Sequence, residues 1–219
     1  MKRFIPALLI ILLGIIIAYL IIDQPKILKV YNPIDVNPEL VDESVRNVDK
    51  FHRVGSFKLT DQDGNEVTEN SFAAKIYVTD FFFVTCPTIC PKMATQMNRV
   101  YDEFKENNMV MLLSHTVMPV ADSVPVLKEY AKKLGVYSKK WKFVTGDKPQ
   151  IYNLARKAYF AAITKGDGGV DDFVHTENFI LVDKEKRLRG FYDGTSEKDV
   201  GRLIADIYAL IEEYKDNDN

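Results

Sequence analysis

An uncharged block of 19 residues, from Phe4 to Ile22, limits what this chain of 219 residues can be. A helix of this length spans roughly 28 Å at about 1.5 Å per residue, close to the apolar thickness of a bilayer. Lys2 and Arg3 precede the block and Asp23 follows it. The block therefore predicts a transmembrane anchor with its N-terminus in the cytoplasm and the rest of the chain on the extracytoplasmic side.

A cleaved signal peptide is the alternative interpretation of this block. Such peptides have an apolar region of about 7–15 residues and a cleavage site of small residues. This block is longer, and it ends in Leu20-Ile21-Ile22 without an A-x-A pattern. We therefore expect residues 1–22 to form an uncleaved anchor. In a bacterium the soluble domain would then lie on the periplasmic side of the inner membrane.

Charge and cysteine content exclude several classes of protein. The 29 basic and 31 acidic residues leave a net charge of −2, whereas nucleic-acid binding calls for a strongly basic face, so we expect no nucleic-acid partner. The two cysteines are too few for a disulfide-dense scaffold or a zinc site of four cysteines. A hydrophobic fraction of 47% is enough for a folded core.

Composition divides the rest of the chain in two. Residues 23–50 contain Pro25, Pro33 and Pro38 and little periodic apolar pattern, which predicts a tether that holds a domain clear of the membrane. Residues 51–219 form one stretch of globular pattern, long enough for a single domain with its own core.

Within 51–219, apolar stretches of strand and helix type alternate, which predicts an α/β fold with a central mixed sheet flanked by helices. A hairpin is expected around Asp61-Gln62-Asp63-Gly64-Asn65 because Asp-Gly favours a tight turn. Further strands are predicted over residues 76–84, 109–114, 141–145, 179–183 and 188–192. Helices are predicted over residues 89–107, 122–134, 149–159 and 196–214.

Both cysteines lie at the junction of a predicted buried strand and a predicted helix. Cys86 and Cys90 have the spacing C-x-x-x-C. The start of a helix offers free N–H groups and a partial positive charge, which stabilise a thiolate as nucleophile or metal ligand. At positions i and i+4 the two sulfurs can share one metal ion or close a reversible disulfide. Two buried structural cysteines remain the alternative.

Three histidines are candidate further ligands: His52, His115 and His175. His175 has the best context, because it lies between the Gly-rich stretch 166–169 and the strand predicted at 179–183. His115 ends another predicted strand and could lie at the same edge, whereas His52 is expected at the surface. Two thiolates and one imidazole suit copper and also zinc, but no fourth ligand for a structural zinc site is evident.

At this point the sequence resembles the Sco/SenC family. The resemblance covers about residues 51–214 and rests on FKLTDQDGNEVT, TCPTICPKM and VHTENFILVDKEKRLRGFYDGT. It implies a membrane-anchored protein with a thioredoxin-like fold that binds copper, as Cu(I) or Cu(II), through Cys86, Cys90 and His175.

The resemblance also implies a function. A family member of this kind is a metallochaperone that delivers copper to the dinuclear copper centre of a respiratory cytochrome c oxidase. It could instead be a thiol–disulfide reductase, with Cys86 attacking and Cys90 resolving, or a redox or copper sensor. The implied partners are the copper-binding subunit of the oxidase, other copper chaperones and thiol reductants. Whether the protein is a turnover enzyme stays open.

The sequence departs from the family pattern at several positions. Asp80 stands in the strand before the cysteines, where it could tune a thiol or simply pair with a structural donor. The usual S-V-D-P stretch reads Ser114-His115-Thr116-Val117-Met118-Pro119. Met93 and Met118 are soft donors, but methionine is more often core filler. Thioredoxins have C-x-x-C and a cis proline before the facing strand, whereas this chain has Thr176-Glu177-Asn178 there, which favours metal binding.

Overall fold

The computed structural model describes residues 12–14, 26–39, 41, 43–44, 46–137, 139–162, 169 and 173–217. The predicted anchor lies outside these residues, apart from three helical residues at 12–14. Within the described part of the chain, none of the helices is both long and apolar enough to span a bilayer.

One sheet of seven strands forms the centre of the domain, in the order β2-β1-β5-β4-β3-β6-β7. Strands β3, β4 and β5 are parallel, and the remaining neighbours pair antiparallel. The predicted mixed sheet, including both hairpins, is therefore confirmed. The strands are β1 Lys58–Asp61, β2 Glu66–Thr68, β3 Ile76–Phe82, β4 Val110–Thr116, β5 Trp141–Thr145, β6 Asn178–Val182 and β7 Leu188–Asp193.

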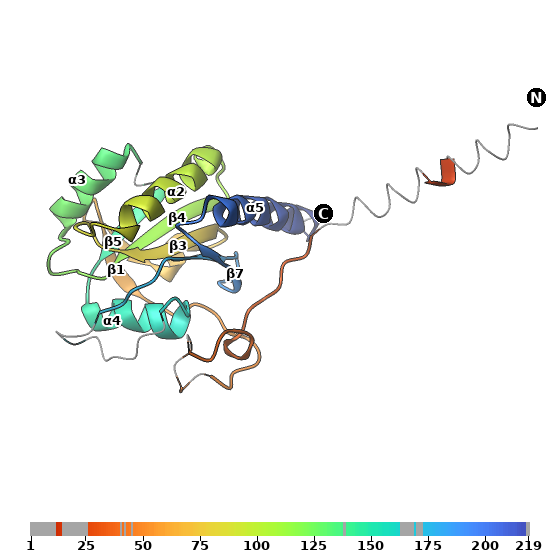
Figure 1. Ribbon diagram of the computed structural model, residues 1–219, viewed down its shortest axis with the longest axis horizontal. Helices are drawn as coiled ribbons and strands as arrows, with labels where there is room; N and C mark the ends of the chain where they lie inside the picture. The colour runs from red at the N-terminus through yellow and green to blue at the C-terminus, as the bar shows by residue number, and fades with distance from the viewer. Residues whose placement is uncertain are drawn as a thin grey trace, which may run out of the picture.

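Helices cover both faces of this sheet (Figure 1). One face carries α2 (Ile89–Phe104), α3 (Val124–Leu134) and α5 (Glu197–Asn217), and the other carries α4 (Lys148–Asn153). The predicted helix over 149–159 is α-helical only as far as α4, and a π-helical turn, η3 (Leu154–Ala158), continues it. Short 3-10 turns η1 (Pro33–Asp35) and η2 (Glu69–Phe72) lie earlier in the chain.

Local sequence explains where the helices bury their apolar side and where they end. In α2, Met93, Met97, Val100 and Phe104 recur at spacings of three and four and are all buried against the sheet. Helix α3 ends at Gly135, whose φ of +70° is the left-handed conformation that glycine adopts without strain.

Alternation along the two central strands decides which side chains meet. All seven residues of β3 and all seven of β4 are buried, as expected for parallel strands covered on both faces. In β3, Val78 and Phe82 belong to the core under α2, whereas Tyr77 and Phe81 belong to the core on the α4 side. Successive residues of a strand point to opposite faces, so Asp80 points toward α2.

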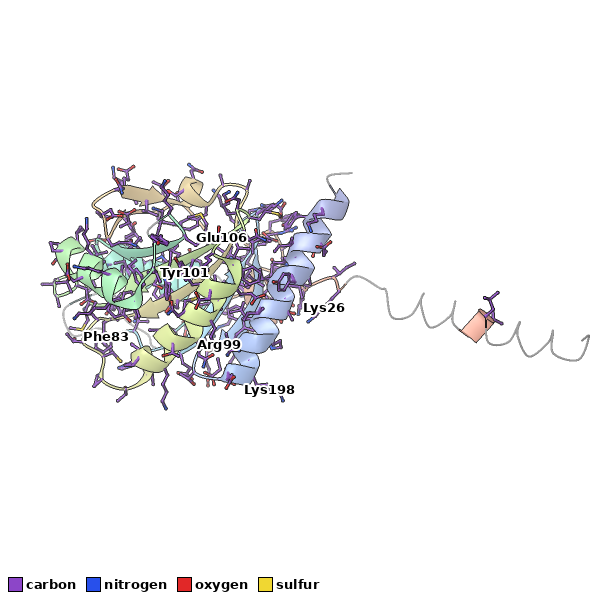
Figure 2. The ribbon with its side chains drawn as sticks, turned by 90° about the horizontal axis from the view of Figure 1, so that it is seen from above. Lys26, Phe83, Arg99, Tyr101, Glu106 and Lys198 are labelled. Carbon is purple, nitrogen blue, oxygen red and sulfur yellow. The ribbon has the colours of Figure 1, made fainter. Side chains whose placement is uncertain are left out.

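The stretch predicted to be a tether contacts the domain. Leu28 is buried and its carbonyl accepts a hydrogen bond from Arg189 (2.8 Å), while Tyr31 forms a β-bridge with Leu188. Lys26 pairs with Asp206 of α5 at 2.5 Å, on the side of the molecule away from Phe83 (Figure 2). Residues 26–31 therefore lie along β7 and α5 instead of standing clear, because they cover the free edge of the sheet.

Candidate metal and redox site

The two cysteines lie where β3 passes into α2. A turn closed by the Cys86 N–H donating to the Phe83 carbonyl (3.3 Å) leads from the strand to the helix. The Cys90 N–H, in the first turn of α2, donates to the Cys86 sulfur at 3.5 Å. Both thiols are free, and the two residues are only 8% and 6% exposed. The strand-to-helix placement expected from the spacing is confirmed.

The surroundings of the two thiols drive their pKa values apart. Burial opposes ionisation of Cys86, but hydrogen bonds from the Cys90 thiol and from backbone N–H groups of Thr88 and Cys90 outweigh it and lower the pKa of Cys86. Burial, together with the hydrogen bond and charge of Cys86, raises the pKa of Cys90 to about 12. Cys86 is therefore the thiol that ionises first.

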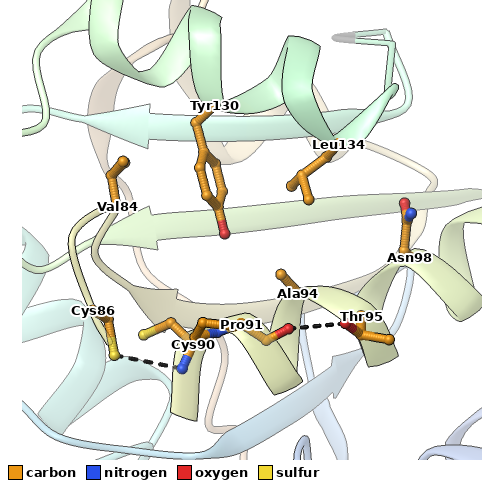
Figure 3. A pocket seen from close by; sticks show the side chains of 9 residues that line it. All are labelled: Val84, Cys86, Cys90, Pro91, Ala94, Thr95, Asn98, Tyr130 and Leu134. Atoms are coloured by element: carbon orange, nitrogen blue, oxygen red, sulfur yellow. Dashed lines mark hydrogen bonds between the residues drawn. The ribbon is translucent and has the colours of Figure 1, made fainter. Parts of the chain in front are cut away.

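Both cysteines open onto a groove between α2 and α3 (Figure 3). The groove has a volume of about 320 Å³, and most of its lining is apolar. Its lining residues are Val84, Cys86, Cys90, Pro91, Ala94, Thr95, Asn98, Tyr130 and Leu134. The groove leaves the otherwise buried sulfurs one open side from which a ligand or a partner's thiol can reach them.

His175 reaches the neighbourhood of the cysteines through the pairing of β6 with β3. Thr79 lies opposite Ile180 in this antiparallel pair, which confirms the predicted proximity of the two strands. The ring of Phe173 supports this placement, because it contacts the rings of Phe83 (centroids 5.4 Å apart) and His175 (4.4 Å).

The structure does not close the predicted site. His175 is exposed, and no set of three or more His, Cys, Asp or Glu side chains in the described part of the chain is arranged to hold a metal ion. The Gly-rich stretch expected to swing His175 lies outside the described residues, apart from Gly169. The donor types still fit a soft metal, because two free thiols and an exposed imidazole are carried by adjoining segments.

His115 lies at the expected end of the sheet, opposite Phe81 of β3, but it points to the opposite face from the cysteines. It is fully buried, its ring stacks on Phe81 (4.8 Å), and its Nδ1 lies 3.1 Å from Thr79 Oγ1. Burial lowers the pKa of His115 to about 3. The reason is strand alternation: one position along β4 separates His115 from Ser114, which faces the α2 side.

The other candidate donors have structural surroundings. His52, expected at the surface, is partly buried and donates from Nε2 to the Ala158 carbonyl (2.9 Å), and burial lowers its pKa. Met93 is buried in the core under α2, and Met118 packs against the core on the α4 side. The interpretation of both methionines as core filler agrees with these positions.

Asp80 combines the two roles that the sequence left open. Its Oδ1 accepts a hydrogen bond from the Ser114 hydroxyl, whose oxygen in turn accepts one from Trp141 Nε1 (2.8 Å). Burial raises the pKa of Asp80 to about 7, and the charge of Asp80 is one of the influences that raise the pKa of Cys90. Asp80 is thus a structural acceptor whose charge also acts on the Cys90 thiol.

Asp122 was not predicted as a site residue, because it lies just beyond residues 114–119, which contain no acid. Its buried carboxylate accepts hydrogen bonds from the Val84 N–H (3.1 Å) and from Thr116 Oγ1 (2.5 Å). It therefore joins the end of β3, just before the cysteines, to the end of β4. Nothing in the spacing pointed to it, because the contact depends on how the two loops fold over the sheet.

Comparison with known proteins gives consistent matches over most of the chain. The sequence profile of the SCO1/SenC family matches residues 45–212. The "SCO1 protein homolog" of Bacillus subtilis is 30% identical over 158 residues, which cover 71% of this chain and 81% of the relative.

Solved structures match as well. One is the structure of BsSco, a member of the Sco family of cytochrome c oxidase assembly proteins in which a disulfide switch was identified. It has a TM-score of 0.62 and 29% identity, and the match covers 73% of this chain and 93% of that one. Arabidopsis thaliana ScoI, solved with copper bound, has a TM-score of 0.56 and 28% identity, covering 73% and 98%.

Proposed function

Since this chain belongs to the SCO1/SenC family and has its thioredoxin-like fold, we propose that it binds copper and delivers it to the dinuclear copper centre of a respiratory cytochrome c oxidase. The observation that carries the proposal is the pair of free thiols at the start of α2, open to a groove. A solved relative carries copper, and another is described as an assembly protein of this oxidase.

The proposed ligands are Cys86, Cys90 and His175. Soft thiolates and an imidazole favour copper over harder cations. Cys86 ionises most readily and supplies the first ligand, while Cys90 gives up its proton as the cation binds. The imidazole of His175 has to move from its exposed position to join the two sulfurs. Release to a partner then proceeds by stepwise exchange, in which the partner's cysteines replace these ligands one at a time.

The proposed location follows from the N-terminal block. An anchor over Phe4–Ile22 would hold the domain at the extracytoplasmic face of a membrane. The contacts of Lys26 and Leu28 with α5 and β7 support a domain kept near that surface, because only three residues separate the block from Lys26. A membrane-bound oxidase subunit would then be within reach.

A second function, thiol–disulfide reduction, is favoured by the unequal thiols. The Cys86 thiolate would attack a disulfide of the target, forming a mixed disulfide and releasing one target thiolate. The Cys90 thiol would lose its proton and attack the Cys86 sulfur, releasing the second target thiolate and leaving a Cys86–Cys90 disulfide. The two electrons gained by the target come from the two cysteines, which a thiol reductant must restore.

Copper loading and transfer test the proposal directly. The reduced full chain, purified in detergent, should bind one copper(I), and Cys86→Ser or Cys90→Ser should weaken binding on the order of a thousandfold because a thiolate ligand is lost. Met118→Leu is the matched control, since that sulfur lies on the other side of the sheet. Metal analysis with a competing chelator gives stoichiometry and affinity.

The same preparation separates the two functions. Copper(I)-loaded chain mixed with the reduced, copper-free subunit should transfer its copper, which metal analysis of the re-isolated subunit measures. Copper-free chain mixed with the disulfide form of the subunit should leave its thiol count unchanged. Failure of copper transfer together with rapid disulfide reduction would replace delivery by the reductase function.

A further inference from the structure

The buried carboxylate of Asp122 has no role in the proposed copper or thiol chemistry. It is 1% exposed, although aspartate is seldom buried without a charged partner. Its two hydrogen-bond donors, the Val84 N–H and the Thr116 hydroxyl, are both uncharged. Burying a carboxylate costs free energy, and here it supplies hydrogen-bond acceptance that an apolar side chain in the same loop would not supply.

The position of its donors shows what it holds. β3 ends at Phe82, so the Val84 N–H lies beyond the last strand pair and needs another acceptor. Asp122 supplies it from the loop that connects β4 to α3. The Thr116 oxygen also accepts from the Met118 N–H (3.0 Å), and the Val117 N–H donates to Phe82 (2.8 Å). The ends of β3 and β4 are thereby tied together.

The cysteine motif begins at this tie. Two residues after Val84, the Cys86 N–H closes its turn on Phe83, and the Cys90 N–H donates to the Cys86 sulfur. The sulfur lies at the helix start only while this turn keeps its shape. A shift of the turn by about 1 Å would remove the sulfur from hydrogen-bond range of the Cys90 N–H, because such bonds weaken steeply with distance and angle.

We propose that Asp122 is a positioning residue for the reactive thiol: its carboxylate holds the turn between β3 and α2 so that the Cys86 sulfur stays at the N–H groups of α2. Its importance for copper binding or thiol exchange rests on the proposed function, but the positioning itself does not. The oxygen that accepts from Val84 is what matters, and the negative charge is not required.

Alkylation of the thiols tests this on the full chain, reduced, copper-free and in detergent. Iodoacetamide at pH 7 followed by peptide mass spectrometry measures the rate at Cys86. Asp122→Ala should slow it by about 3- to 10-fold, because the turn is released and the Cys86 sulfur leaves its place at the start of α2. Amide exchange in the peptide containing Val84 should speed up in the same variant, since that N–H loses its acceptor.

Two further variants keep the result decisive. Asp122→Asn retains an acceptor oxygen and should alkylate within about twofold of the unmodified chain. Tyr152→Phe removes a buried hydrogen bond to the Val117 carbonyl (2.9 Å) in the same loop, and should also leave the rate within about twofold. Fluorescence of Trp141, the only tryptophan, reports whether each variant is folded.

An unchanged Cys86 rate in folded Asp122→Ala would overturn the proposal, and so would an equal slowing in Tyr152→Phe, which would indicate general loosening. Should Asp122→Ala fail to fold, Asp122→Asn decides: a threefold or greater slowing there would show that the charge matters and would overturn the geometric role. No copper is present, so these outcomes are independent of whether the chain delivers copper.

Discussion

The two faces of the central sheet use the same strands for different purposes. On the α2 side, Asp80 lies beneath a pair of cysteines that open onto a groove. On the α4 side, His115 is enclosed by the rings of Phe57, Phe81 and Tyr159, and its Nε2 has no hydrogen-bond partner. Reactive residue types occur on both faces, but the cysteines open onto a groove, whereas His115 is sealed from solvent. Access, set by packing, therefore separates a candidate site from a core.

The histidines show the same contrast. His175 is exposed on a segment that packs against the loop before the cysteines, whereas His115 is sealed in an aromatic cluster. The sequence placed both near the ends of central strands. Strand alternation turns His115 to the face opposite the cysteines, whereas the segment that carries His175 contacts Phe83 through the ring of Phe173.

Substituting each histidine in turn should give the largest difference between the faces. His175→Ala should weaken copper(II) binding by about 100-fold and copper(I) binding by less than about tenfold, because two thiolates alone can hold copper(I). His115→Phe should change neither by more than about twofold. Chelator competition and the copper(II)–thiolate charge-transfer band measure both. Equal losses in the two variants would show that the sheet does not separate the sites.

Asp80, on the same face of the sheet as the cysteines, should lower the stability of the fold as pH rises and its carboxyl ionises. Its folded pKa of about 7 lies above its usual 3.8, so its stabilising contribution is complete below about pH 4 and is lost as pH rises toward 7. Asp80→Asn keeps an acceptor for Ser114 and should gain about 2 kcal/mol of unfolding free energy at pH 8, with no gain at pH 4.

Urea unfolding followed by Trp141 fluorescence checks this. Asp102→Asn, an exposed acid on α2, is the control and should change stability by less than about 0.5 kcal/mol at either pH. A loss of stability at pH 8 in Asp80→Asn would mean that the sheet accommodates the ionised carboxylate.

His115, on the other face of the sheet, should lower the stability of the fold as pH falls, and this is the smallest of the expected effects. Its folded pKa of about 3 lies below its usual 6.5, so stability is complete above pH 6.5 and is lost as pH falls toward 3. Between pH 8 and pH 5, charging of His115 should remove about 1–2 kcal/mol of unfolding free energy and so oppose the gain expected from Asp80. Over the same interval His115→Phe should therefore gain about 1–2 kcal/mol more stability than the unmodified chain. The same unfolding assay measures it, with the pH 8 value of the variant giving its packing change alone. If the unfolding free energy changed equally with pH in both proteins, the loss of stability in acid would come from groups other than His115.

Much of the fold follows from local pattern. The hairpins, the order of strands and helices, the end of α3 at Gly135 and the cysteines at the start of α2 all match the structure, because periodicity, turn residues and helix ends act within a few residues. The pairing of residues 26–31 with β7 and α5 could not be anticipated, since it depends on a sheet edge that forms only in the folded domain.

The thiol pair and its place at the junction of β3 and α2 were determined by sequence alone, because the residues that create them are neighbours in the chain. Tertiary structure alone decided which distant side chains belong with them. In the folded domain Asp80 and Ser114 form a hydrogen bond on the face of the sheet that carries the cysteines. His115 stacks on Phe81 on the opposite face, and Asp122 accepts a hydrogen bond from Val84. These contacts join residues more than 30 positions apart, so they depend on strand register and loop packing, which single-residue preferences do not specify.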